Sequence, residues 1–350
     1  MKQARVLIID DSALVRQILS QGLATDPAIE VVGVAQDPYV ARDLIVTSQP
    51  NVLTLDVEMP RMDGIEFLRR LMPQFPLPVI MVSSLTDRGA QITLDALEAG
   101  AIDFVTKPKS NVASGLNNMI HDLCEKVKMA AQVDVSYRKG QIAAPRKSSN
   151  FVSRSLAKST HKVVAIGAST GGTEALRKVA NQFPSTMPGV VVVQHMPAGF
   201  TKMFAQRLND ECSMEVKEAE TGDQISPGLM LIAPGEHHMK VMRSGGIYRV
   251  ECEPGPKVCG HCPSVEVLFQ SVAKYVGSNA VGAMLTGMGS DGADGMLLMR
   301  QQGARTIAQD EKTSVVFGMP KVAFERGGAE RLVAIEDIPS AIFNLLDSID

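Results

Sequence analysis

Short aliphatic runs alternate with longer segments of helical periodicity from residue 4 to about residue 129. The aliphatic runs are residues 6–9, 31–34, 52–55, 79–82 and 102–105. Among the segments whose apolar residues recur at intervals of three and four, the clearest are residues 13–24, 88–99 and 115–127. Apolar strands separated by helices are typical of a parallel sheet covered on both faces. This pattern predicts a doubly wound α/β domain with a five-stranded parallel sheet.

A second alternation of the same kind begins at residue 163. The expected strands are residues 163–166, 190–194, 229–233, 280–285, 306–308 and 332–335. The expected helices are residues 172–181, 201–208, 264–276, 293–302 and 339–346. Residues 238–250 are expected to form a hairpin around Ser244-Gly245-Gly246, because glycines suit a tight turn between antiparallel strands. The pattern predicts a second domain, a mainly parallel α/β sandwich with a hairpin.

The segment between the two alternations lacks the periodicity of a helix or a strand. It is rich in lysine, arginine, serine and proline. This composition is typical of a solvated linker, although a basic segment can also serve as an interaction tail. We therefore expect one domain at residues 1–129, a linker at residues 130–160 and a second domain at residues 161–350.

Composition narrows the class of protein. With a net charge of -3 over 350 residues, the chain lacks the bulk positive charge by which many proteins bind nucleic acids. Five cysteines are an odd and sparse set for a secreted disulfide framework, which favours a reducing compartment. No secretory signal is visible, and the apolar runs are far shorter than the roughly 18 residues of a membrane helix. We expect a cytoplasmic protein that binds no nucleic acid and does not insert into a membrane.

Acidic residues follow two of the strands predicted in the first domain. Asp10 and Asp11 come directly after the first strand, and Asp56 comes directly after the third. Because the carboxyl ends of parallel strands line the ligand-binding crevice, these carboxylates should converge there. Mg²⁺ prefers such oxygen ligands and relieves their mutual repulsion. The ends of the fourth and fifth strands add Ser83 and Lys107, a hydroxyl and an ammonium suited to the oxygens of an acyl phosphate.

Together these positions resemble the response-regulator receiver domain of two-component signalling, across residues 4 to about 127. The motifs that carry the resemblance are Ile9-Asp10-Asp11-Ser12, Leu55-Asp56-Val57-Glu58-Met59-Pro60, Met62-Asp63-Gly64 and Thr106-Lys107-Pro108. The resemblance implies that Asp56 accepts the phosphoryl group and that Asp10 and Asp11 hold Mg²⁺ with it. It also implies that Ser83 is the switch hydroxyl and that Lys107 contacts the phosphoryl group. Phe104 falls at the aromatic switch position of the family, and a buried core phenylalanine is the alternative interpretation.

A glycine-rich turn, Gly167-Ala168-Ser169-Thr170-Gly171-Gly172, lies between a strand and a helix of the second domain. This Gly-x-Ser-x-Gly string can present a serine hydroxyl beside backbone N–H groups, and a phosphate-binding turn is the alternative. Because a serine needs a base, we look for a histidine at the same sheet edge and find His195 after the next strand. Asp291 lies in a glycine-rich loop beyond a later strand, where it could orient the imidazole.

The chain order Ser169, His195, Asp291 differs from the Ser, Asp, His order of the α/β-hydrolase fold. Over its whole length the sequence instead resembles the CheB family, the chemotaxis response regulators that are protein-glutamate methylesterases. The motifs that carry the resemblance are Ala165-Ile166-Gly167-Ala168-Ser169-Thr170-Gly171-Gly172-Thr173-Glu174, Gln194-His195-Met196-Pro197, Ala233-Pro234-Gly235, and Leu285-Thr286-Gly287-Met288-Gly289 with Asp291 and Gly292.

This second resemblance implies hydrolysis of glutamate γ-methyl esters on methyl-accepting chemotaxis receptors, with deamidation of receptor glutamines, in chemotactic adaptation. It implies that the Met288 backbone N–H helps to form an oxyanion hole, that Thr170 supports the site, and that the esterase site needs no cofactor. A chemotaxis histidine kinase would donate the phosphoryl group. The receiver would pack over the active site until phosphorylation loosens that contact, and the enzyme would work beside membrane receptors without entering the bilayer.

Two other functions compete with this interpretation. A response regulator with a DNA-binding output would carry a basic recognition helix in a helical domain, whereas the second domain is rich in predicted strands. A noncatalytic receptor-binding adaptor would share the fold. The presence of Ser169, His195 and Asp291 argues against an adaptor.

A loop in the second domain collects metal-binding residue types. Cys259, His261 and Cys262 lie within four residues of one another, and Cys252 precedes them. A structural zinc site commonly uses two well-spaced ligand pairs, and the sequence has no second Cys-x-x-Cys. We therefore expect a surface loop here rather than a zinc site.

Overall fold

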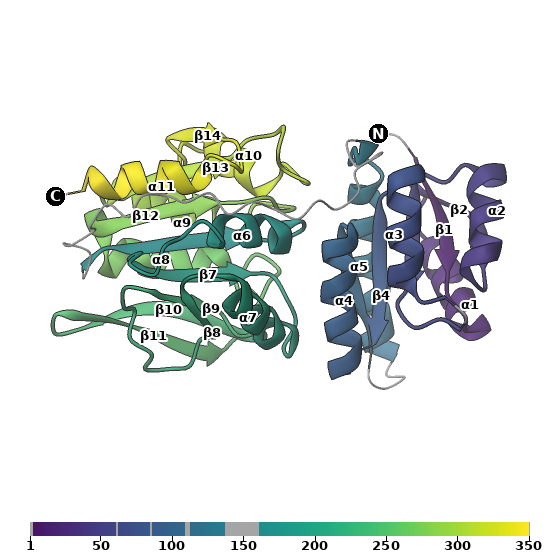
Figure 1. Ribbon diagram of the computed structural model, residues 1–350, viewed down its shortest axis with the longest axis horizontal. Helices are drawn as coiled ribbons and strands as arrows, with labels where there is room; N and C mark the ends of the chain where they lie inside the picture. The colour runs from purple at the N-terminus through teal and green to yellow at the C-terminus, as the bar shows by residue number, and fades with distance from the viewer. Residues whose placement is uncertain (1–2, 61, 85, 109–112, 137–160, 350) are drawn as a thin grey trace. The chain divides into compact units, whose positions relative to one another are not determined.

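The computed structural model describes residues 3–60, 62–84, 86–108, 113–136 and 161–349. The chain folds into two compact units, Met1–Arg146 and Lys147–Asp350 (Figure 1). The linker predicted at residues 130–160 falls largely outside the described residues, because residues 137–160 are not among them. Each unit is therefore described by itself.

The first unit is a five-stranded parallel sheet with strand order β2-β1-β3-β4-β5. The strands are β1 (Ala4–Ile9), β2 (Ile29–Ala35), β3 (Val52–Asp56), β4 (Val79–Ser84) and β5 (Asp103–Lys107). The helices are α1 (Ala13–Leu23), α2 (Pro38–Ser48), α3 (Gly64–Gln74), α4 (Asp87–Ala99) and α5 (Ala113–Ala130). The predicted doubly wound fold is confirmed. Because the strand order reverses between β1 and β3, a ligand crevice is expected at their carboxyl ends.

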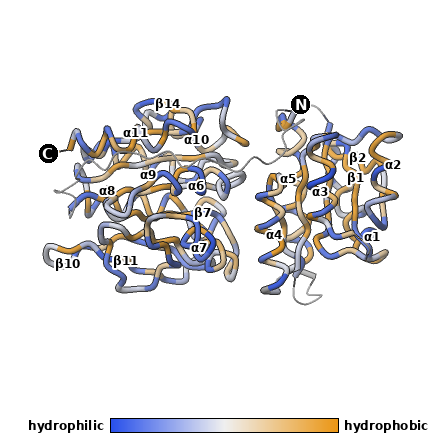
Figure 2. Tube along the Cα trace, viewed as in Figure 1, coloured by the Kyte–Doolittle hydropathy of each residue, from blue (hydrophilic) through white to orange (hydrophobic). Residues whose placement is uncertain are grey.

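Burial explains why these strands read as continuous apolar runs. Every residue of β3 is buried, and in β1 only Arg5 is partly exposed. The tube in Figure 2 is accordingly mostly hydrophobic along β1. Helix α3 begins where the Asp63 carboxylate accepts a hydrogen bond of 2.7 Å from the Glu66 N–H. The Gly64 N–H donates to the carbonyl of Val57 at 3.1 Å, which places the Met62-Asp63-Gly64 motif beside the carboxyl end of β3.

The second unit is built on a seven-stranded sheet with strand order β14-β13-β12-β6-β7-β9-β8. Every strand pair in it is parallel, and β10 and β11 form a separate antiparallel hairpin. The strands are β6 (Val163–Ala168), β7 (Gly189–Gln194), β8 (Glu215–Glu218), β9 (Leu229–Ile232), β10 (His237–Ser244), β11 (Ile247–Pro254), β12 (Ala280–Met284), β13 (Arg305–Gln309) and β14 (Arg331–Val333). The helices are α6 (Gly172–Ala180), α7 (Phe200–Glu211), α8 (Val265–Tyr275), α9 (Ala293–Gln301), α10 (Met319–Glu325) and α11 (Ile338–Asp347), with a short 3-10 turn at Gly277–Asn279.

The predicted α/β sandwich with a hairpin is confirmed, with four differences in detail. Strand β8 was not predicted because Glu215 and Lys217 interrupt its apolar positions, as is common in an edge strand. Helix α10 was not predicted because it has only 7 residues and a proline in its first turn. Strand β14 ends at Val333, two residues before the predicted end, and the hairpin extends beyond the predicted residue 250 to Pro254.

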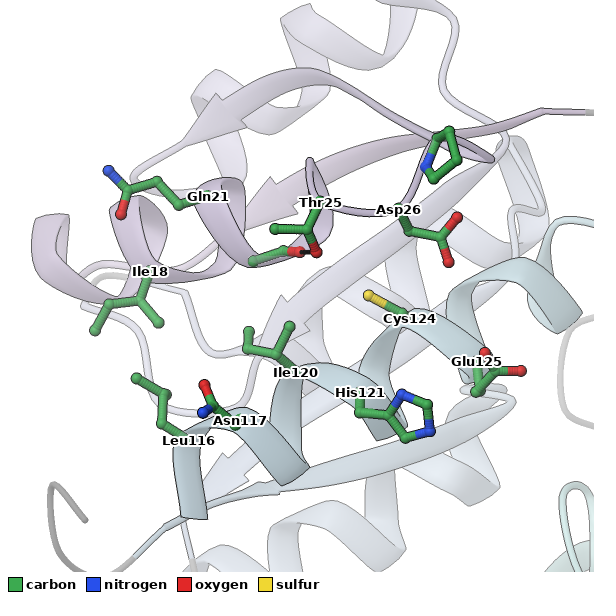
Figure 3. A pocket seen from close by; sticks show the side chains of 12 residues that line it. Ile18, Gln21, Thr25, Asp26, Leu116, Asn117, Ile120, His121, Cys124 and Glu125 are labelled. Carbon is green, nitrogen blue, oxygen red and sulfur yellow. Dashed lines mark hydrogen bonds between the residues drawn. The ribbon is translucent and has the colours of Figure 1, made fainter. Parts of the chain in front are cut away.

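A groove with a volume of about 700 Å³ lies between α1 and α5 of the first unit (Figure 3). Ile18 and Gln21 line it from α1, and Ile120, His121 and Cys124 line it from α5. None of the residues that line it is among the acidic residues predicted to bind a cation. Across the described residues, no helix is long and apolar enough to span a bilayer.

Candidate active site and phosphorylation site

Three neighbouring strands of the second unit bring Ser169, His195 and Asp291 together. Strand β6 lies between β7 and β12 in the sheet. Ser169 follows β6, His195 follows β7, and Asp291 lies between β12 and α9. Backbone hydrogen bonds tie these ends together, since the Ser169 N–H donates to the Thr286 carbonyl and the His195 N–H donates to the Ala168 carbonyl. The shared sheet edge expected from the sequence is therefore present.

The three side chains form one continuous chain of hydrogen bonds. The Nδ1 atom of His195 lies 3.1 Å from the Ser169 hydroxyl, and the Nε2 atom lies 2.7 Å from an Asp291 carboxylate oxygen. A carboxylate can only accept, so the neutral ring that fits carries its proton on Nε2 and leaves Nδ1 free to accept from serine. Ser169 is 9% exposed and Asp291 is 2% exposed. The arrangement can transfer a proton from the serine to the imidazole.

The N-terminus of α8 holds the Asp291 carboxylate in place. One oxygen accepts hydrogen bonds from the Ser264 hydroxyl at 2.7 Å and the Glu266 N–H at 3.1 Å, and the other accepts from the Val265 N–H at 2.7 Å. Burial opposes ionisation, but hydrogen bonds from His195, Ser264 and Val265 outweigh it and lower the pKa of Asp291. The carboxylate therefore stays ionised beside His195.

The side-chain amide of Gln194 also fixes the site, a role that sequence analysis did not assign to this residue of the Gln194-His195-Met196-Pro197 motif. Its Nε2 donates to the carbonyls of Ser169 at 3.0 Å and His195 at 3.2 Å. Gln194 is 3% exposed. One buried amide thus links the two loops that carry the nucleophile and the base.

The loop after β12 approaches the nucleophile closely. The Thr286 hydroxyl donates to the Thr170 carbonyl at 3.0 Å, which positions both residues at the turn. Thr170 is 5% exposed and Met288 is partly exposed. In the part of the chain that the structure describes, the Met288 N–H makes no hydrogen bond. It can therefore serve as a donor to a bound oxyanion.

A side chain would not fit at Gly287, because Ser169 lies directly against it. A methyl group there would lie 2.8 Å from the Ser169 Cβ and 2.4 Å from the Met319 sulfur. We expect Gly287→Ala to lower kcat for ester hydrolysis about 100-fold, because small misplacement of a nucleophile is costly. Gly246→Ala is the matched control, since a methyl group there meets nothing within 4 Å. Equal kcat values for the two variants would contradict this prediction.

The first unit gathers the three predicted carboxylates at its strand ends. One oxygen each from Asp10, Asp11 and Asp56 lies within 4.8 Å of the others. Asp10 and Asp56 are buried and Asp11 is exposed. The Lys107 ammonium lies 3.0 Å from Asp10 and 2.9 Å from Asp56. These residues could hold a divalent cation, as predicted from the sequence.

Burial controls the ionisation of this cluster. Burial raises the pKa of Asp56 to about 6, with the charge of Lys107 opposing it and the charge of Asp10 adding to it. Burial alone would lower the pKa of Lys107, but Asp56 and Asp10 outweigh it and the net shift is upward. The lysine therefore remains a cation at neutral pH. The pKa of Asp56, about 6, lies just below neutral pH.

The predicted switch residues lie on neighbouring strands of the same sheet, Ser83 near the end of β4 and Phe104 near the start of β5. The Ser83 hydroxyl lies 2.6 Å from the Thr93 hydroxyl and 3.2 Å from the Gly89 carbonyl. Within the described residues, these hydrogen bonds direct Ser83 toward α4 rather than toward Asp56. Phe104 is 5% exposed, and the Lys126 ammonium lies 5.7 Å from its ring centre.

The cysteine loop brings no three potential metal ligands together within the described residues. Cys252, Cys259 and Cys262 are free thiols. Among the described residues, the acidic group of the first unit is the only cluster of three or more potential metal ligands. Burial is the main cause that raises the pKa of Cys259 and Cys262, and the charge of Asp291 adds to it at Cys259. Both thiols are therefore poor nucleophiles.

Together, the two units define a response regulator whose output unit brings a serine, a histidine and an aspartate into hydrogen-bond contact. The response regulator receiver domain family matches residues 6–114, and the CheB methylesterase family matches residues 164–342. The chain belongs to the CheB methylesterase family.

Known relatives cover nearly the whole chain. A protein-glutamate methylesterase/protein-glutamine glutaminase of Syntrophotalea carbinolica is 66% identical over 99% of this chain and 98% of its own length. A protein of the same name from Salmonella typhimurium is 51% identical over 97% of this chain and 95% of its own length. The crystal structure of the Thermotoga maritima CheB methylesterase catalytic domain is 38% identical, with a TM-score of 0.51, and covers 53% of this chain and 98% of that one. The chain is accordingly a hydrolase with a receiver domain.

Proposed function

We propose that this protein hydrolyses glutamate γ-methyl esters on chemotaxis receptors and deamidates receptor glutamines. The observation that carries the proposal is the continuous contact from Ser169 through His195 to Asp291, at 3.1 and 2.7 Å. The names of the relatives support the substrate class. Its test is methanol release from receptor membranes that carry methyl esters. A receptor-binding adaptor would release none.

In the proposed reaction, His195 Nδ1 takes the proton of the Ser169 hydroxyl as the serine oxygen attacks the ester carbonyl carbon. The ring then gives that proton to the departing methoxide, methanol leaves, and a glutamyl ester of Ser169 remains. Water attacks this ester while His195 accepts its proton, and the free glutamate carboxylate leaves as the serine regains a proton. With a glutamine substrate, ammonia leaves in place of methanol.

Two groups stabilise the charges that develop during the reaction. Asp291 orients the ring through Nε2 and stabilises its cationic form, because its own pKa is lowered. The Met288 N–H donates to the tetrahedral oxyanion, and Thr170 supports the turn that carries the nucleophile. Donors of this kind typically contribute about 10²–10³-fold in rate.

We further propose that the receiver, at residues 1–129, controls the esterase at residues 161–350, with residues 130–160 as the linker that joins them. Asp56 is the phosphoacceptor, with a chemotaxis histidine kinase as the donor and Lys107 as the phosphoryl contact. Ser83 is the switch hydroxyl, and Phe104 occupies the aromatic switch position. The protein would act in the cytoplasm, beside the membrane receptors that are its substrates.

The donor set of the receiver fits Mg²⁺, because three carboxylates converge and two of them are buried. When bound, the cation supplies positive charge that neutralises the developing charge on the transferred phosphoryl group. Asp10 and Asp11 would hold it together with Asp56. The esterase site requires no cofactor in this proposal.

The raised pKa of Asp56 predicts a pH-dependent affinity for Mg²⁺. The carboxylate must be ionised to bind the cation, and it takes up a proton as the pH falls through about 6. We therefore expect the apparent Kd to rise about tenfold between pH 8 and pH 5. Isothermal titration calorimetry measures this directly, which suits a chain without tryptophan. Asp56→Asn should bind more weakly and lose the step near pH 6, and a wild-type Kd independent of pH would contradict the prediction.

A further inference from the structure

A second histidine ring lies flat against the ring of His195. The ring centres of His195 and His261 are 3.7 Å apart and the rings are inclined by only 9°. The hydrogen bonds to Ser169 and Asp291 hold the His195 ring at its edges, at Nδ1 and Nε2. Those bonds limit rotation of the His195 ring within its own plane. Tilting of the ring out of that plane is resisted by side chains packed on its faces. His261 covers one of those faces.

The segment that carries His261 also holds Asp291. Val258 and His261 form a pair of backbone hydrogen bonds of 3.0 Å that close a two-residue turn at Cys259 and Gly260. Both turn residues have positive φ, 50° at Cys259 and 85° at Gly260, which is the conformation of the tightest hairpin turns. The chain then reaches Ser264 and the start of α8, whose hydroxyl and N–H groups bind the Asp291 carboxylate.

The segment from Val258 to Ser264 therefore fixes both the in-plane orientation and the plane of the His195 ring. Through Ser264 it fixes the carboxylate that orients the ring, and through His261 it fixes the plane in which the ring lies. Cys259 adopts the left-handed region although it has a Cβ, which is a conformation that costs free energy. Two rings at this separation are in van der Waals contact, and an aromatic ring face also favours an adjacent cation.

We propose that His261 is a positioning residue for His195. It keeps the imidazole in the plane that contains both the serine hydroxyl and the carboxylate, and its ring face stabilises the imidazolium that forms as Ser169 attacks. This role deepens the proposed esterase function and rests on it. What His261 contributes is a flat aromatic surface, so a phenylalanine should serve nearly as well.

The test compares three variants in the full-length protein with methylated receptor membranes as substrate. We expect His261→Ala to lower kcat for methanol release about 10- to 100-fold, with KM changed less than about twofold, because misalignment affects the transition state more than binding. His261→Phe should recover most of the lost kcat. His161→Ala is the matched control, since His161 is exposed and precedes β6 at the end of the strand opposite Ser169.

A second readout does not depend on turnover. In ¹H NMR spectra of protein labelled with ¹⁵N-histidine, the Nε2 proton shared by His195 and Asp291 should give a downfield resonance. We expect it to broaden or disappear in His261→Ala and to persist in His261→Phe. A wild-type kcat in His261→Ala, or a His261→Phe variant no better than His261→Ala, would overturn the proposal. If wild-type protein releases no methanol, the esterase function fails, and the NMR comparison alone then decides the positioning role.

Discussion

Ser169→Ala should abolish methanol release from methylated receptor membranes, with kcat lowered by about 10⁴-fold or more. The substitution removes the hydroxyl oxygen that lies 3.1 Å from His195 Nδ1. Without this nucleophile no acyl-enzyme can form. Gln194 and Thr286 bind backbone atoms of this residue, and those contacts do not require its hydroxyl. We therefore expect the fold to persist without the activity.

Thermal unfolding and phosphorylation by acetyl phosphate provide the controls for this loss. Ser169 belongs to the second compact unit and Asp56 to the first, so the variant should still take up a phosphoryl group at Asp56. Methanol release at the wild-type rate would show that Ser169 is not the nucleophile. No release from either protein, even after phosphorylation, would favour a receptor-binding adaptor.

The sheets were predictable from the sequence where strands are buried on both faces. Strands β6 and β7 are fully buried and therefore read as unbroken apolar runs. The edge strand β8 exposes Glu215, and this mixture of polar and apolar residues kept the strand from being predicted. Helix α10 is held by tertiary packing, since its buried Met319 lies against Gly287, and seven residues carry too little periodicity to show it.

The candidate site was predictable because parallel strands end at a common edge. Ser169, His195 and Asp291 each follow a strand, so the sequence could assign them to one edge without knowing the strand order. Ser264 and His261 escaped prediction because the segment that carries them follows the β10-β11 hairpin rather than a strand of the sheet. Only the packing of α8 brings that segment to Asp291 and His195.

The two sites use burial in opposite ways. Asp291 is buried, yet the hydrogen bond from His195, together with those from Ser264 and the Val265 N–H, keeps its pKa low. Asp56 is buried beside another carboxylate, and its pKa rises to about 6. A permanent charge suits a group that orients a base throughout turnover. A carboxylate whose charge is costly to bury suits a site that binds a cation and is then modified.

Phosphorylation of Asp56 should raise the rate of ester hydrolysis, and Asp56→Asn should eliminate that response. A coupling between two sites of about 1–3 kcal/mol corresponds to a change of about 5- to 150-fold, and we expect wild-type activation within that range. The asparagine keeps the size of the side chain but offers no carboxylate for the phosphoryl group or for Mg²⁺. Methanol release is measured before and after incubation with acetyl phosphate and Mg²⁺.

Asp43→Asn is the matched control, because Asp43 lies on α2 with a side chain that is 70% exposed and pairs with Arg42. It should retain the full activation, whereas Asp56→Asn should keep only the basal rate. If wild-type protein hydrolyses esters equally fast before and after phosphorylation, and no faster than Asp56→Asn, the receiver does not control the esterase. Activation that persists in Asp56→Asn would instead place the phosphoryl group on a different residue, because the cluster would then lack its proposed acceptor.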